Sequence, residues 1–221
     1  MTIKIRRARP SSATLINFQD CHAALQDLRH AGARAVDFKG LLETDAAVRR
    51  ATTLPVDRAI VGFASVDTRS ERAEAQDRFV RAAQAAGISL EQIDYRDAYV
   101  NTTSPADESG VRAKGVQTLA APISFALGAL ADRDAASVVL FAGSYEHAYG
   151  IRQFAARNGR LVLAFWRSCV DQRFFAREVI GSPNISFVDL EEHPAVLGGV
   201  DVRVGAANAA GVRSAGIGTL F

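Results

Sequence analysis

The sequence has few of the residues that mark disulfide-rich or metal-stapled folds. It contains two cysteines, one tryptophan and one methionine in 221 residues. Cys21 and Cys169 stand alone and far apart, so the chain has neither the paired spacing of a zinc knuckle nor the cysteine density of a disulfide framework. The two thiols are therefore predicted to stay reduced and to pack as small apolar groups.

Long hydrophobic runs are also missing. No segment reaches the roughly 18 apolar residues that a membrane span requires. The basic start of the chain runs into Pro10 before any apolar stretch that could act as a signal sequence. We therefore expect no membrane association and a cytoplasmic location.

A large excess of charge of one sign is missing as well. The formal net charge is +2, with 48% hydrophobic and 23% charged residues, which is typical of a globular protein. Such a balance does not by itself predict a nucleic-acid ligand. Basic residues gather only in residues 1–12, where Lys4, Arg6, Arg7 and Arg9 form an N-terminal arm. This arm suits a phosphate backbone, although a solvated tail has the same composition.

Strand-like and helix-like segments alternate along residues 13–194. Runs of apolar and β-branched residues at 13–17, 58–66, 88–95, 137–142, 160–166 and 185–190 predict strands, and helical spacing lies between most of them. Gly32 and Gly87 stop two of the helices. The alternation predicts one α/β domain, a three-layer sandwich with a mainly parallel sheet of five or six strands.

Two stretches interrupt this alternation. Residues 97–115 are polar and predict an exposed loop long enough to be functional or disordered. Residues 195–221 are rich in glycine and alanine and predict a loosely ordered C-terminal tail. The tail ends in Leu220-Phe221, so residues 211–221 either pack back on the domain or dock on a protein partner.

The residues after the strand at 137–142 carry the most chemistry. In open parallel sheets ligands sit at the carboxyl ends of strands, and here Ser144, Tyr145, Glu146 and His147 follow that strand. Ser144 with His147 as base resembles a nucleophile elbow, but the second glycine of that turn is absent. A capping serine followed by a first-turn acid is the simpler interpretation.

The order and spacing of three motifs resemble the NYN branch of the PIN-like nucleases, the LabA-type group, over most of residues 13–190. In that family an Asp-x-x-Asn motif ends the first strand, a Lys-Gly-x-Asp segment opens a middle helix, and Ser-Gly-Asp-x-Asp-Phe follows the central strand. The matching positions here are Asn17 and Asp20, then Lys114 and Gln117, then residues 142–147. The resemblance implies a PIN-like, Rossmann-like topology.

The resemblance also implies a metal-dependent ribonuclease cleft, but this chain lacks most of its acids. In the family, three or four carboxylates hold Mg²⁺ or Mn²⁺, which activates water for attack on a phosphodiester. Only Asp20 and Glu146 remain as metal ligands here and, if the protein is active, as catalytic residues. Two acids predict no metal or a weakly bound Mg²⁺ or Mn²⁺, unless a nearby acid such as Asp189 completes a shifted site.

Neighbouring residues suit nucleic acid without catalysis. Basic side chains could contact phosphates, and Tyr145 and His147 could stack on unpaired bases. The predicted nucleic-acid-binding set is Asn17, Arg112, Lys114, Gln117, Ser144, Tyr145, His147 and Arg167. We expect a degenerate domain that binds single-stranded RNA or another phosphate-rich ligand. The alternatives are an active ribonuclease with substituted ligands, and an assembly protein that forms homo-oligomers or docks through its tail.

Overall fold

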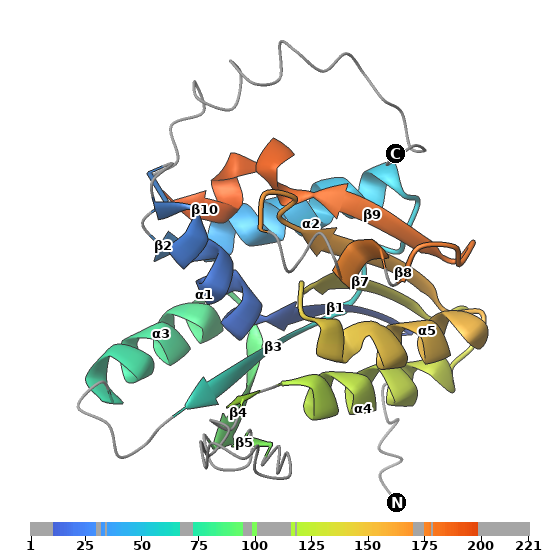
Figure 1. Cartoon of the computed structure of the whole chain (residues 1–221), viewed down its shortest axis with the longest axis horizontal. Coiled ribbons are helices and arrows are strands. Elements are labelled where there is room, and N and C mark those ends of the chain that lie inside the picture. The colour runs from blue at the N-terminus through green and yellow to red at the C-terminus, as the bar shows by residue number, and fades with distance from the viewer. Residues whose placement is uncertain are drawn as a thin grey trace, which may run out of the picture.

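Six strands form one parallel sheet at the centre of the molecule (Figure 1). The computed structural model describes residues 11–29, 32–33, 35–66, 73–94, 99–100, 116–117, 119–169, 175–177 and 179–198. The sheet has the order β4-β3-β1-β7-β8-β9, and every neighbouring pair is parallel. Its strands are β1 (Ser12–Asn17), β3 (Ala59–Val66), β4 (Ser89–Asp94), β7 (Ser137–Phe141), β8 (Arg160–Phe165) and β9 (Ile185–Asp189).

Helices cover both faces of this sheet and complete three layers. One face carries α1 (Phe18–Asp27), α2 (Phe38–Ala51) and α3 (Ala73–Ala85), and the other carries α4 (Ala120–Ala131) and α5 (Ala148–Ala156). Side chains alternate between the faces along β1: Leu15 belongs to the core with α4 and α5, whereas Ile16 belongs to the core with α1 and α2. The predicted three-layer α/β sandwich with a mainly parallel sheet is confirmed.

The strand order places a change of direction between β1 and β7. From β1 the chain moves outward through β3 and β4, and it then returns through α4 to β7 on the other side of β1. Ligands of open α/β sheets bind outside the carboxyl ends of the strands at such a switch point. Asn17 ends β1, and Gly143 and Ser144 follow β7, so these residues lie at that place.

The fold continues past the predicted domain boundary at residue 194. After the short helical turns η3 (Leu190–Glu192) and η4 (Pro194–Val196), β10 (Leu197–Gly198) pairs antiparallel with β2 (Ala35–Val36). Val196 is fully buried, and its carbonyl accepts a 2.9 Å hydrogen bond from Asp37 N–H. Residues 196–198 therefore bond to the domain, although two-residue strands leave no periodic signal in a sequence. Residues 199–221, with the predicted docking segment, lie outside the described residues.

A second small ladder frames the predicted polar loop. β5 (Tyr99–Val100) pairs antiparallel with β6 (Val116–Gln117), which brings the two ends of the 97–115 stretch together. Residues 101–115 lie outside the described residues, as do the arm residues 1–10. Among the described helices, none combines the length and the apolar character that a bilayer crossing needs.

Candidate functional site at the carboxyl ends of β1 and β7

Asn17 closes β1 and starts α1. Its Oδ1 accepts hydrogen bonds from the N–H groups of Gln19 (2.9 Å) and Asp20 (3.2 Å), which caps the helix. Because these two bonds fix Oδ1, the Nδ2 group of the side chain points the other way, to within 2.8 Å of Nε2 of His147. The cap therefore determines which end of the amide meets the imidazole.

That orientation assigns the protonation of His147. An amide Nδ2 can only donate, so Nε2 must accept, and the neutral ring carries its proton on Nδ1. His147 is fully buried, and its Nδ1 has no hydrogen-bond partner in the described part of the chain. A buried donor without an acceptor costs about 1–3 kcal/mol. Such a group is uncommon in folded proteins and marks this position as unusual.

Asp20 binds the loop after β7 through three hydrogen bonds, which together form the Asp20 clasp. Its Oδ2 accepts from the N–H groups of Gly143 (2.7 Å) and Ser144 (3.0 Å), and its Oδ1 accepts a short hydrogen bond from the Ser144 hydroxyl. Burial alone would raise the pKa of Asp20, but the imidazole of His147 and these donors lower it below the ordinary value of 3.8. Nε2 of His147 lies 3.6 Å from Oδ2, and the imidazole lowers the pKa of Asp20 most, followed by the donors of Gly143 and Ser144.

The clasp leaves Asp20 little capacity for a metal ion. Three of its acceptor positions are filled by its own protein, and the side chain is only 10% exposed. Glu146, the other predicted ligand, lies exposed on the short helical turn η2 (Tyr145–His147). Within the described ranges, no three His, Cys, Asp or Glu side chains are placed to hold a metal together. The weak two-acid metal site remains a prediction.

The contacts of Ser144 match neither of the interpretations made from the sequence, which were a helix-capping serine and a nucleophile. Its side chain makes no cap hydrogen bond to η2, and its hydroxyl donates to Asp20. Only the backbone joins it to His147, whose N–H donates to the Ser144 carbonyl at 3.2 Å. The hydroxyl therefore holds the β1 and β7 ends together, and it does not pair with the imidazole as a nucleophile would.

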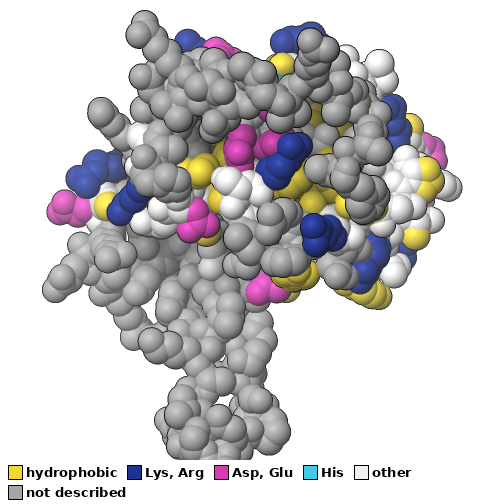
Figure 2. Space-filling view, turned by 45° about the horizontal axis from the view of Figure 1, so that its top comes forward, with side chains coloured by type: hydrophobic (Ala, Val, Ile, Leu, Met, Phe, Trp, Pro, Cys, Tyr) yellow, Lys and Arg dark blue, Asp and Glu magenta, His cyan; other side chains and the backbone are white. Residues whose placement is uncertain are grey.

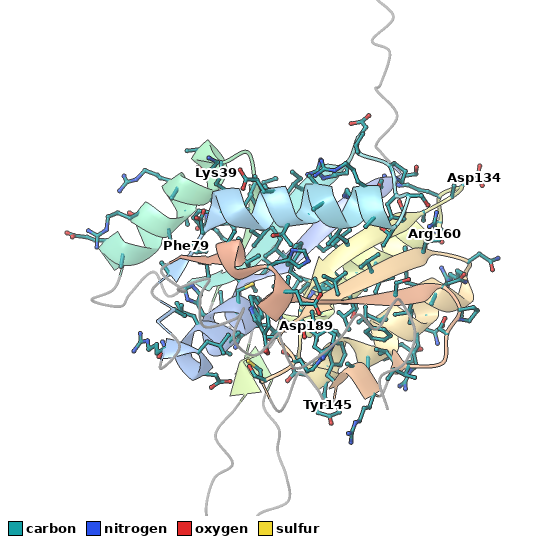
Figure 3. All side chains as sticks on the ribbon, turned by 90° about the horizontal axis from the view of Figure 1, so that it is seen from above. Lys39, Phe79, Asp134, Tyr145, Arg160 and Asp189 are labelled. Carbon is teal, nitrogen blue, oxygen red and sulfur yellow. The ribbon has the colours of Figure 1, made fainter. Side chains whose placement is uncertain are left out.

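Two exposed groups form the rim of this site. Tyr145 is 46% exposed, and Arg167, in the turn after β8, pairs with Asp189 at 3.2 Å. Burial raises the pKa of Asp189, while Arg167 acts against that rise. Figure 3 shows Tyr145 and Asp189 well apart from Asp134 and Arg160, which mark the amino ends of β7 and β8. Figure 2 shows acidic, basic and apolar side chains together in the middle of the described surface.

The structure thus gathers part of the predicted set. Asn17, Asp20, Ser144 and His147 are in contact, whereas Tyr145, Glu146 and Arg167 are exposed nearby. The backbone of Gln117 lies in β6, and Arg112 and Lys114 lie outside the described residues. Trp166, at the end of β8, is 2% exposed and belongs to the core.

Sequence reasoning missed the part that backbone groups take in the site. The N–H groups of Gly143 and Ser144 hold Asp20, and backbone donors are the same in every sequence. The available signal was a glycine directly after a buried strand, because that residue lets another segment approach closely.

Comparisons with known proteins bear on the fold alone. No family model and no curated protein matches this chain. A crystal structure of a protein of unknown function from Vibrio parahaemolyticus RIMD 2210633 has a TM-score of 0.54 and 13% sequence identity, over 84% of this chain and 94% of that chain. The chain is therefore similar in architecture to a solved α/β protein to which no activity is assigned.

Proposed function

We propose that this chain is a degenerate NYN-like domain that binds single-stranded RNA, or another phosphate-rich ligand, at the carboxyl ends of β1 and β7. Metal-dependent cleavage is weak or lost. The observation that carries the proposal is the clasp on Asp20, which accepts from Gly143, from the Ser144 N–H and from the Ser144 hydroxyl. Asp20 stands where the family motif has its asparagine, and this acid, one of the two that remain at this edge, holds the loop after β7 in place.

Restoring a metal site would require Asp20 to leave its donors. Each hydrogen bond to a charged group contributes about 1.5–3 kcal/mol, so opening the clasp offsets much of what a divalent ion would gain from one carboxylate. Asn17 and Ser144 stand where the family has aspartates, and neither carries a charge. These features favour binding over cleavage.

The rim supplies groups that suit an unpaired nucleic acid. Tyr145 offers a half-exposed ring for base stacking, and Arg167 offers a guanidinium whose side chain is 47% exposed. Tyr145 follows β7 at the switch point of the sheet, and Arg167 follows the neighbouring β8 at the same carboxyl edge, where ligands of such folds bind. Arg112 and Lys114 of the predicted set, together with the basic residues of the N-terminal arm, would add phosphate contacts.

Binding is measured by fluorescence anisotropy with a labelled single-stranded RNA at several salt concentrations. The affinity should fall steeply with salt because phosphate contacts release counterions. Tyr145→Ala should weaken binding about tenfold, as expected for a lost stacking platform, and Arg167→Ala should reduce the salt slope. The matched control is Arg157→Ala, since Arg157 is also exposed and pairs with Asp132 at 3.0 Å near the amino ends of the strands.

Cleavage is measured separately by adding Mn²⁺ to the same RNA. We expect no turnover above the background of the Asp20→Ala and Glu146→Ala variants. Cleavage that disappears in both variants would show an active nuclease and contradict the proposal. Equal affinity in the wild type, Tyr145→Ala and Arg167→Ala would remove the binding site from this edge.

A further inference from the structure

Helix α4 contains no charged residue. Its sequence from Ala120 to Ala131 is AAPISFALGALA, and a helix that is apolar all round is normally covered on every side. Here only the inner face is covered, by way of Ile123, Leu127 and Leu130. The outer face is exposed, and Phe125 at its centre is 79% exposed. The outer face of α4 consists of Ala121, Phe125, Gly128 and Ala129.

The helices on the two faces of the sheet differ in how many charged residues they carry. Helix α5, which lies beside α4 (Figure 1), has Arg152 as its one charged residue, whereas α2 has five charged residues and α3 has four. Of the exposed large hydrophobic residues in the described ranges, Phe125, Tyr145, Tyr149 and Ile180 belong to the α4 and α5 side and Val56 does not. Exposed apolar side chains are therefore more frequent on the α4 and α5 side, and exposed apolar surface is typical of interaction sites.

Gly128 gives a second, independent indication. It lies inside α4, where glycine costs about 1 kcal/mol relative to alanine. A Cβ at this position would meet no described atom within 4 Å, so packing inside the domain does not require the glycine. Its backbone is helical, so conformation does not require it either. A gap beside the large ring of Phe125, one turn earlier on the same face, is what a close external contact would use.

We propose that the outer face of α4 binds the same face of a second copy of this chain. The two helices pack antiparallel about a two-fold axis, so that Phe125 of each copy fills the gap at Gly128 of the other. Such a contact is self-complementary, as a two-fold interface must be. The outer face of α4 does not include Tyr145 or any other residue of the proposed RNA site, and the dimer contact does not depend on that site.

The size of the surface predicts the strength of the dimer. A twelve-residue helix is about 18 Å long, and α4 together with the flanking α5 is about 20 Å wide, so a contact centred on α4 that extends over α5 covers at most roughly 360 Å² in projection. A stable interface buries about 800 Å² per partner. The dimer should therefore be weak and should form with rising concentration, with a dissociation constant in the micromolar range.

Sedimentation velocity over about 1–300 µM tests the dimer. We expect a monomer at the lowest concentration, a dimer at the highest, and only monomer in the Phe125→Asp variant. The matched control is Val56→Asp, because Val56 is 63% exposed in the loop before β3 and should leave the dimer intact. A chain that stays monomeric throughout, or a dimer that survives Phe125→Asp, would overturn the proposal.

Variants of Gly128 separate the interface from the stability of the helix. Gly128→Ala should raise the melting temperature of the monomer by about 2–4 °C and weaken the dimer about tenfold, because the methyl group occupies the gap. Gly128→Leu should abolish the dimer. A dimer that is unchanged in Gly128→Leu, or that is lost only when residues 211–221 are removed, would show that another segment makes the contact. Either result would contradict the proposal for α4.

Discussion

Strand β1 has a buried polar cluster at each end, and the two clusters are built differently. At the amino end, the fully buried Arg49 of α2 donates to Asp45 (3.1 Å), Ser12 Oγ (2.8 Å) and the Ala13 carbonyl (2.7 Å). Arg58 also pairs with Asp45, at 2.6 Å. At this end the buried Asp45–Arg49 pair has a partner on every side, and the partly exposed Arg58 keeps one nitrogen, Nε, without one.

The carboxyl-end cluster is less complete. Asp20 has its donors, but the fully buried His147 keeps a proton on Nδ1 with no described acceptor. The two clusters therefore differ in whether a fully buried side chain keeps an unpaired polar atom. The amino-end cluster fixes α2 and β1 for stability, whereas the carboxyl-end cluster keeps hydrogen-bonding capacity at the place where ligands of such sheets bind.

Breaking the amino-end cluster should have the largest effect. Arg49→Met leaves Asp45 buried with Arg58 as its remaining charged partner, and the loss of one member of a buried pair costs about 3–5 kcal/mol. Urea unfolding should show this loss at unchanged m-value. The control is Arg50→Ala, one residue later and exposed, which should change the free energy of unfolding by less than about 0.5 kcal/mol. Equal losses in both variants would show that the cluster contributes nothing special.

Opening the carboxyl-end clasp should have a smaller, pH-dependent effect. Asp20→Asn loses the charge that Gly143 and Ser144 bind, so we expect about 1–3 kcal/mol of destabilisation at pH 7. The folded pKa of Asp20 is lowered, so this stability is present above the ordinary carboxyl value and is lost as the pH falls toward the folded pKa. Unfolding curves between pH 7 and pH 3 should therefore converge for the wild type and the variant.

For Asp189, the same unfolding measurement should show the opposite pH dependence. Burial raises its folded pKa, so the charged form is disfavoured in the native state and the protonated form is favoured. Asp189→Asn should therefore be less destabilising at neutral pH than at a pH below the folded pKa. The difference in free energy of unfolding between the wild type and Asp189→Asn should grow as the pH falls. If it instead shrank with falling pH, as for Asp20→Asn, the two carboxyl groups would not differ as described.

Exchanging the partner of His147 should change the tautomer of the imidazole ring. Asn17→Asp replaces a donor with an acceptor opposite Nε2, so the imidazole proton should move from Nδ1 to Nε2. Nitrogen NMR of the ring distinguishes the two tautomers, and Asn17→Ser, which keeps a capping oxygen, is the control. Protonation on Nε2 already in the wild type would contradict the assignment.

The sequence allowed most of the fold to be predicted, because its strands are buried on both faces. Runs such as 137–142 are apolar throughout, and that signal needs no tertiary information. The small ladders β2–β10 and β5–β6 could not be predicted, since two residues carry no period. Their pairing depends on segments that meet only after the sheet has formed.

The candidate site was predictable in its location but not in its chemistry. Asn17, Asp20, Ser144 and His147 were identified because they lie at or just after the ends of β1 and β7 and at the positions of the resembling motifs. Their roles could not be assigned in advance, because the Asp20 clasp depends on backbone N–H groups and the His147 tautomer depends on the direction of one amide. Such details follow from geometry, which residue identity alone does not fix.

The contact between α2 and the 194–198 segment can form only late in synthesis. Gly40 lies so close to Ala195 that a Cβ would come within 1.8 Å of its carbonyl oxygen, and about 155 residues separate the two. During synthesis the first turn of α2 therefore remains without its final cover until almost all of the described chain has been made. A nascent chain stalled before Pro194 should hold the start of α2 open to proteases, although its own sequence is already complete.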